Sequence, residues 1–311
     1  MDARRPFRLN ADQLLPLTHK SDARGLARAL GHLGAIATST GLLWAAHGTL
    51  WALPLTLLQG YLLAFLFNAL HETAHQTALR RRAANLALGH LAGFAILLPY
   101  EYYRAFHWDH HRYTQDPERD PELFVPPPAS RLALAWTVGG VPTWIGRVRM
   151  LFMHGVLGRV GERWIAADKR ALIVAEARCY LLGYAVVIAA SLAAQTWAAL
   201  WLWLLPLVAG QWLLRPYLLA EHTGCAHSTD MLANTRTTLT NAVVRYFAWN
   251  MPYHAEHHAY PAVPFHALPR LHTLLAGRIV HVAPGYRSAA RAVLRHVDKT
   301  SAAQAAHAAD A

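Results

Sequence analysis

The sequence predicts an all-α integral membrane protein, in which four transmembrane helices form two hairpins and a cytoplasmic helical cap holds a histidine-rich dimetal site. Two observations carry this prediction. Apolar residues make up 54% of the 311 residues and charged residues only 15%, and the apolar residues fall in long blocks. Three clusters of histidines lie next to these blocks.

Four apolar stretches are long enough to cross a bilayer as helices, which takes about 20 residues each. The only Lys or Arg residues within them are Arg178 and Arg215, each near an end of its stretch, where a long side chain reaches the interface. The alternative is a large soluble core that contains two buried helical hairpins. The predicted spans cover residues of about 30–46, 50–70, 177–194 and 197–219.

The links within the two predicted hairpins, at 47–49 and 195–196, contain no Lys or Arg. The positive-inside rule therefore places both termini, the central segment and the metal site on the cytoplasmic side. Abundant Arg and Ala are typical of a GC-rich bacterial genome, so we expect a bacterial inner membrane. The net charge of +11 indicates attraction to an anionic membrane surface, and the sequence has no recognisable nucleic-acid-binding motif.

The chain is predicted to form one membrane domain at 26–285, between a cytoplasmic N-terminal segment at 1–25 and a C-terminal region at 286–311. That region is expected to hold a helix and a disordered tail from Ser301. The apolar segment 84–100 is predicted to lie in the interface or under the cap. A third span there would put the first two histidine clusters on opposite sides of the bilayer. A helix-like run at 237–248 leads into the third cluster.

The three histidine clusters have the sequences HETAH, HWDHH and HAEHH. A single HxxxH pair is expected by chance among 20 histidines, but two copies of HxxHH are not. On a helix, positions i, i+3 and i+4 share one face, so each cluster is expected to point its imidazoles the same way. Eight imidazoles are too many for one metal ion and suit two. The predicted ligands are His71, His75, His107, His110, His111, His254, His257 and His258.

A ninth ligand is expected at the end of the fourth span. His222 is favoured because it lies at the membrane boundary beside the predicted site, and His227 is its competitor. Asp109 and Glu256 lie inside the clusters but off the ligand face, so they are predicted to accept the outer imidazole N–H, and Glu72 likewise. The alternative for each is an ordinary solvated charge.

Two asparagines precede the third cluster. Asn250 lies four residues before His254 and would share its helix face if the helix continues through Pro252, where it would hold a metal-bound water. Asn241 is the less favoured candidate.

Histidine-rich ligation with few carboxylates favours a redox-active di-iron site that activates oxygen. Di-zinc hydrolysis is the alternative, although such sites usually include a bridging Asp or Glu. A membrane metal-handling protein is a further alternative, but it would need polar ligands along the middle of the spans, which offer almost none.

The clusters HETAH, HWDHH and HAEHH, spread over a pair of predicted hairpins, resemble those of the membrane-bound fatty acid desaturase and hydroxylase superfamily. The resemblance covers residues of about 50–275. It implies two iron ions held by the eight cluster histidines and His222, with O2 as co-substrate and two electrons from an external carrier. The metals rather than a catalytic side chain would carry the chemistry.

The same resemblance implies an oxygen-dependent desaturase that acts on an acyl chain or an acyl-like metabolite. A hydroxylase or an oxidative decarboxylase on the same di-iron core is the alternative. Tyr100, Tyr102, Tyr103 and Trp108 either line the substrate channel or pack at the interface. The sequence has no cytochrome b5 motif and no GxGxxG, so we expect electrons from a separate donor such as a ferredoxin or a reductase.

Overall fold

The computed structural model describes residues 8–309, and these residues are mostly helical. Three segments are long and apolar enough to cross a membrane, which indicates an integral membrane protein: Ala52–Ala74, Ala167–Ala193 and Leu200–His222. They overlap three of the four predicted spans, and the span predicted at 177–194 begins earlier, at Ala167. The other predicted span, 30–46, lies in helix α2 (Asp22–Ala45), which is long enough but is not among these apolar segments. Gly, Ser, Thr and His occupy much of that stretch and lower its hydropathy.

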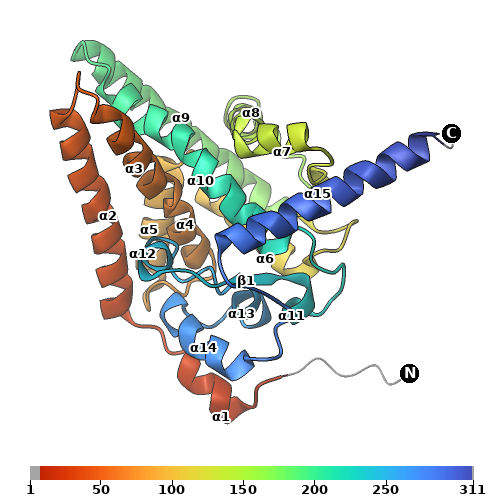
Figure 1. Cartoon of the computed structure of the whole chain (residues 1–311). Helices are drawn as coiled ribbons and strands as arrows, with labels where there is room; N and C mark the ends of the chain where they lie inside the picture. The colour runs from red at the N-terminus through yellow and green to blue at the C-terminus, as the bar shows by residue number, and fades with distance from the viewer. Residues whose placement is uncertain (1–7, 310–311) are drawn as a thin grey trace, which may run out of the picture.

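The three apolar segments contain four α-helices. The segment Ala52–Ala74 consists of α3 (Ala52–Ala64) and α4 (Leu66–Ala74), with a break at Phe65. Helix α9 (Arg170–Ala193) follows a 3₁₀ turn at Ala167–Lys169, and α10 (Leu205–His222) follows a π-helical turn at Leu200–Leu204. Trp44 of α2 stacks on Trp201 with ring centroids 5.8 Å apart. The α2–α3 and α9–α10 connections therefore lie side by side at one end of the molecule (Figure 1).

Helices α3 and α10 are held in close contact by two glycines. A Cβ atom on Gly210 would lie 2.1 Å from the Gly60 carbonyl oxygen, and a Cβ on Gly60 would lie 2.3 Å from the Pro206 carbonyl oxygen. Small residues at such crossings let two backbones approach closely. Both helices begin at the end where the connections meet, so both lead toward the opposite region, where His71 follows on α4 and His222 ends α10.

The predicted interfacial helix is α5 (Arg82–Ala95), and the second histidine cluster lies on α6 (Tyr100–Tyr113). The two helices meet at 101°. Pro99 disfavours the helical conformation at the residue before it, and Leu97 has a positive φ of 58°. The Tyr100 hydroxyl donates to the Thr73 carbonyl at 2.9 Å, which holds the start of α6 against α4. Together α5 and α6 are also long and apolar enough to form one bent span.

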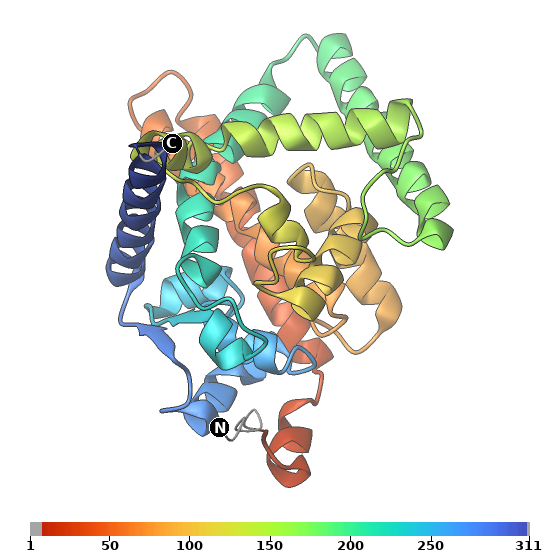
Figure 2. The same cartoon turned by 90° about the vertical axis from the view of Figure 1, so that its right-hand side faces the viewer.

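Short helices occupy the part of the chain between Ser130 and α9. They include α7 (Arg131–Val138), α8 (Val141–Leu151) and a π-helical turn at Phe152–Val156. Helix α7 packs on α10, and α8 packs on α9. In Figure 2 this yellow-green segment runs across the upper part of the molecule.

The region after α10 contains a small parallel sheet that the all-α prediction missed. Strand β1 (Arg236–Thr238) pairs with β2 (His281–Ala283), with Arg236 opposite His281. The helix-like run predicted at 237–248 is therefore shorter, since Thr237 lies in β1 and α12 (Ala242–Phe247) begins after the Asn241 cap. The other helices here are α11 (Met231–Asn234), α13 (His254–Ala259) and α14 (Leu268–Leu275).

The two terminal regions both contain helices, and the C-terminal one differs from expectation. Helix α1 (Ala11–Leu14) and a 3₁₀ turn at Leu15–Leu17 lie in the predicted N-terminal segment, of which residues 1–7 lie outside the described residues. Helix α15 (Tyr286–Ala309) continues past Ser301, where the sequence predicts a disordered tail. Alanine has the highest helix propensity, and residues 302–309 are rich in it.

Candidate metal centre

Five histidines from three parts of the chain converge on one point. Their ligand nitrogens all lie within 4.8 Å of one another, and all five side chains are buried. His75 Nε2 is 2.7 Å from His107 Nε2, and His257 Nε2 is 3.1 Å from His111 Nε2. We call this the five-histidine group, and its members are His71, His75, His107, His111 and His257.

Four other histidines form a second group beside it. The ligand nitrogens of His110, His222 and His258 lie within 4.8 Å of one another. His254 adjoins them, because its Nε2 is 3.2 Å from His222 Nε2 and 3.1 Å from His258 Nε2. The structure thus brings all nine predicted ligands together. His227 lies in neither group, and its Nδ1 is 3.0 Å from the Gln115 carbonyl oxygen.

Each HxxHH cluster divides between the two groups instead of pointing all its imidazoles the same way. On α6, His107 and His111 lie in the five-histidine group and His110 in the second. On α13 the division is reversed, because His257 lies in the five-histidine group and His258 in the second. Consecutive helical residues point about 100° apart, so one helix between two sites serves both.

The arrangement of the nitrogens fits bound metal ions. A hydrogen bond needs one donor and one acceptor, yet His107 Nε2 faces two imidazole nitrogens, at 2.7 and 3.1 Å. Both nitrogens of His71 are buried without a hydrogen-bond partner among the described residues. Imidazole ligands bind first-row metals at about 2.0–2.1 Å, which leaves neighbouring ligand atoms about 3 Å apart. A donor set of nitrogens alone suits iron, copper, zinc or nickel.

The outer nitrogens of the four histidines in the second group have polar neighbours, and His222 Nδ1 is 3.4 Å from the Asn234 carbonyl oxygen. Asp120 Oδ1 is 2.9 Å from His110 Nδ1, Thr114 Oγ1 is 3.1 Å from His258 Nδ1, and Glu221 Oε1 is 3.5 Å from His254 Nδ1. Such partners fix the tautomer and the ring orientation of a metal ligand. Asp120 also accepts from the backbone N–H groups of Gln115 and Glu122, which holds its carboxylate in place.

Asp109 and Glu256, which the sequence predicts in this supporting role, have other partners. Asp109 Oδ1 is 3.5 Å from a guanidinium nitrogen of Arg112 at the protein surface. Glu256 is fully buried, and it pairs with Thr237 and His272. Neither carboxylate contacts a histidine of the two groups in these interactions. The prediction placed acidic residues by helix face within each cluster, whereas the observed partners come from outside the clusters: from a loop, from the end of α6 and from α10.

The remaining candidates hold the backbone around the site. Asn250 has a positive φ of 58° and donates from its side-chain nitrogen to the Phe265 carbonyl, and α13 begins only at His254. The predicted helix through Pro252 is therefore absent, and with it the reason to place Asn250 beside His254. Asn241 caps α12. Glu72 accepts from the Phe265 N–H at 2.9 Å.

Burial favours the neutral form of four of these imidazoles. It lowers the pKa of His75 to about 3, and it lowers the pKa of His254, His257 and His258 well below the usual value, with repulsion from neighbouring histidines adding to it. Burial alone would raise the pKa of Asp120, but the hydrogen bond and charge attraction with His110, together with the two backbone N–H donors, outweigh burial and lower that pKa. A neutral imidazole is the form that binds metal.

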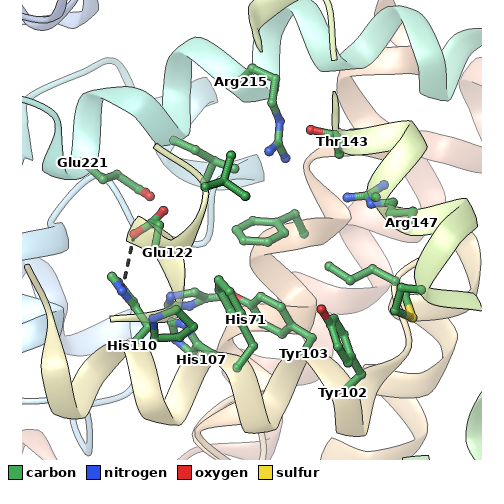
Figure 3. A pocket seen from close by; sticks show the side chains of 18 of the residues that line it. His71, Tyr102, Tyr103, His107, His110, Glu122, Thr143, Arg147, Arg215 and Glu221 are labelled. Carbon is green, nitrogen blue, oxygen red and sulfur yellow. Dashed lines mark ion pairs between the residues drawn. The ribbon is translucent and has the colours of Figure 1, made fainter. Parts of the chain in front are cut away.

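A cavity of about 330 Å³ reaches both histidine groups. Figure 3 shows His71, His107 and His110 on one side of it, with Arg215, Thr143 and Arg147 on the opposite side. Tyr102 and Tyr103 also line this cavity, whereas Tyr100 and Trp108 do not. Its apolar wall consists of Phe67, Leu98, Phe106, Val125, Met150 and Leu218.

The fold and the site together define a helical membrane protein with a buried histidine-rich metal centre. The sequence model of the fatty acid desaturase family matches residues 48–290. The chain belongs to the fatty acid desaturase family, whose members are membrane-bound non-heme di-iron oxidoreductases.

Two curated proteins are similar to the chain, and both are named sn-1 oleoyl-lipid 12-desaturase. The protein from Picosynechococcus sp. is 31% identical over 103 residues, which are 31% of this chain and 30% of that protein. The protein from Synechocystis sp. is 25% identical over 213 residues, which are 66% of this chain and 59% of that protein. The matched region is thus less than two thirds of each relative's length.

Three residues at the site escaped sequence reasoning. Asp120 lies in a proline-rich loop with no motif of its own, although its place just before Pro121 is typical of a residue that caps a turn. Glu221 immediately precedes the candidate ligand His222, and that adjacency could have indicated that Glu221 lies at the site. Arg215 was expected to reach the membrane interface, but it lines the cavity instead.

Proposed function

We propose that the protein is an oxygen-dependent di-iron desaturase that introduces a C=C bond into an acyl chain or an acyl-like metabolite. The observation that supports this most directly is the cavity. It is bounded by histidines of both groups and by apolar side chains, so a saturated carbon chain bound there would lie against the metal centre. The reaction is R–CH2–CH2–R′ + O2 + 2 e⁻ + 2 H⁺ → R–CH=CH–R′ + 2 H2O.

We propose that the five-histidine group and the second group each hold one iron ion. Iron would supply the redox chemistry that couples oxygen reduction to removal of hydrogen from carbon. The chain itself provides neutral imidazoles, and Asp120 and Thr114 orient two of them. The buried surroundings exclude water, and the walls of the cavity determine which carbon lies nearest the metals.

The substrate class proposed here rests on the family and on the relatives. Both similar proteins are named for an oleoyl lipid, and the cavity of this chain has an apolar wall suited to methylene groups. The external electron donor is proposed to be a ferredoxin or a reductase, because two electrons are needed and the sequence carries no motif for a haem, flavin or nicotinamide group.

We further propose that the metal centre and both termini face the cytoplasm of a bacterial inner membrane. The α2–α3 and α9–α10 connections, which lack Lys and Arg between the predicted spans, meet at the end of the molecule away from the histidines. The basic run at Arg80, Arg81 and Arg82 follows the first histidine cluster on the proposed cytoplasmic side.

The proposal is tested by expressing the chain and its His257→Ala variant in a bacterial host and comparing lipids and small metabolites by mass spectrometry. His19→Ala is the matched control, since His19 is exposed and lies in neither histidine group. A product two hydrogens lighter, formed by the intact chain and the control alone, is expected. A product with one added oxygen would replace desaturation with hydroxylation, and equal product with His257→Ala would refute the site.

A further inference from the structure

Arg215 is a cation inside the cavity that makes no direct ion pair among the described residues, although the charges of Glu122 and Glu221 act on it from a distance. Its Nε is buried and has no hydrogen-bond partner among the described residues. No carboxylate in residues 8–309 forms an ion pair with it, although Glu122 and Glu221 line the same cavity. Figure 3 shows its guanidinium group directed into the cavity, toward the histidines on the opposite wall.

The two acidic residues of the cavity lie on the histidine side instead. Glu122 Oε2 is 3.4 Å from His110 Nδ1, and Glu221 Oε1 is 3.5 Å from His254 Nδ1. In Figure 3 both carboxylates lie beside His110, away from Arg147. The cavity is therefore polarised, with acids at the metal centre and cations at the far wall.

Arg147 is the second cation on that wall, and it already has a partner. One guanidinium nitrogen donates to the Ile96 carbonyl at 2.6 Å, and the group lies 5.1 Å from the Trp144 ring centroid. Thr143, one turn earlier on α8, lines the cavity beside it. Arg147 adds positive potential to the site, while Arg215 has donors left to offer a ligand.

A cation removed from bulk water is costly unless an anion or hydrogen-bond acceptors compensate it. A guanidinium group presents a planar fork of N–H donors, which matches the two oxygens of a carboxylate. The cavity also has an apolar wall. A ligand that satisfies both features carries a carboxylate at one end and a hydrocarbon portion next to it.

We propose that Arg215, supported by Arg147 and Thr143, binds the carboxylate of the substrate, so the protein acts on a free carboxylic acid such as a fatty acid. This inference rests on the proposed function, because it assigns the substrate of that same site. Arg215 and His222 lie seven residues apart on one face of α10, which corresponds to roughly 10 Å along the helix. The carbons that are oxidised would therefore lie on the order of 10 Å from the carboxylate.

The test measures binding and needs no turnover. The purified, iron-loaded protein is placed in lipid nanodiscs, and its melting temperature is followed with saturated fatty acids of 8 to 16 carbons and with their methyl esters. The acid is expected to stabilise the protein at lower concentration than its ester. In Arg215→Gln the apparent Kd for the acid should rise by at least about ten-fold, while the Kd for the ester changes little.

Two further variants make the result specific. Arg178→Gln is the matched control, because Arg178 lies on α9 outside this cavity and donates to the Gly155 carbonyl. It should bind the acid as the parent does. Arg215→Lys keeps the charge but not the fork, so it should fall between the parent and Arg215→Gln. Iron content and a melting curve show whether Arg215→Gln folds. If it does not fold, Arg215→Lys tests the proposal in its place.

Equal affinity for acid and ester, or unchanged acid binding in Arg215→Gln, would overturn the carboxylate assignment and leave an ester or a glycerolipid as the substrate. That result would not affect the proposed desaturation. Preferential binding of the acid without any unsaturated product would instead support the Arg215 site and count against the proposed reaction.

Discussion

The rings of His111 and His258 stack on each other, with centroids 4.0 Å apart and an interplanar angle of 12°. His111 belongs to the five-histidine group, and His258 belongs to the second group. This stacked pair lies where the two groups adjoin and joins α6 to α13. Two metal ions held by the two groups would be close neighbours inside one buried shell.

The division of each HxxHH cluster predicts that neighbouring histidines affect different ions. His257→Ala should remove iron from the five-histidine group and His258→Ala from the second group, leaving about one iron per chain in each. The double variant should bind almost none. Elemental analysis of the purified proteins measures this, with His19→Ala as a control that keeps the parental content. Two irons in either single variant would contradict the assignment.

Asp120 should tighten metal binding without contacting the metal. Asp120→Asn removes the negative charge beside His110 Nδ1, and loss of such a partner typically weakens metal affinity by about 10–100-fold. Competition with a chelator measures the affinity. Asp109→Asn is the matched control, because Asp109 pairs with Arg112 at the surface and should leave the affinity unchanged. Equal effects of the two substitutions would argue against the orienting role of Asp120.

Glu256 is expected to support folding rather than metal binding. Glu256→Ala leaves the buried Thr237 hydroxyl unpaired and removes the partner of His272, so the free energy of unfolding should fall by about 1–3 kcal/mol. The iron content of the folded fraction should stay at the parental value. A loss of iron at unchanged stability would instead restore the role that the sequence predicts for Glu256.

The contact between α3 and α10 should tolerate no added methyl group. In Gly210→Ala the new Cβ would lie 2.1 Å from the Gly60 carbonyl oxygen, and such overpacking typically costs about 1–3 kcal/mol. Gly41→Ala is the matched control on α2, since nothing lies within 4 Å of its Cβ position. The melting temperature should fall for the first variant and stay level or rise for the second. A stable Gly210→Ala protein would refute this close contact.

Local pattern was enough to predict much of the fold and the nine convergent histidines. Apolar runs identified the segments that contain α3, α4, α9 and α10, because membrane-spanning length and low charge are properties of consecutive residues. The histidine spacing identified the candidate ligands, and the structure brings them together.

Features that depend on distant parts of the chain could not be predicted in this way. Asp120 reaches His110 through a loop, and β1 pairs with β2 across more than forty residues of sequence. Asn250 was placed by assuming that a helix continues through Pro252, and the positive φ at Asn250 rules that out. Arg215 looked like an interfacial arginine because sequence position alone does not show that α8 and α10 enclose a cavity.

The most direct test of the whole account is the metal content of the intact protein, purified from cells grown with iron and measured by elemental analysis alongside the double variant His257→Ala, His258→Ala. The account predicts about two iron ions per chain in the parent and almost none in the double variant. A parent protein that holds a single ion, or that holds zinc in place of iron, would contradict it.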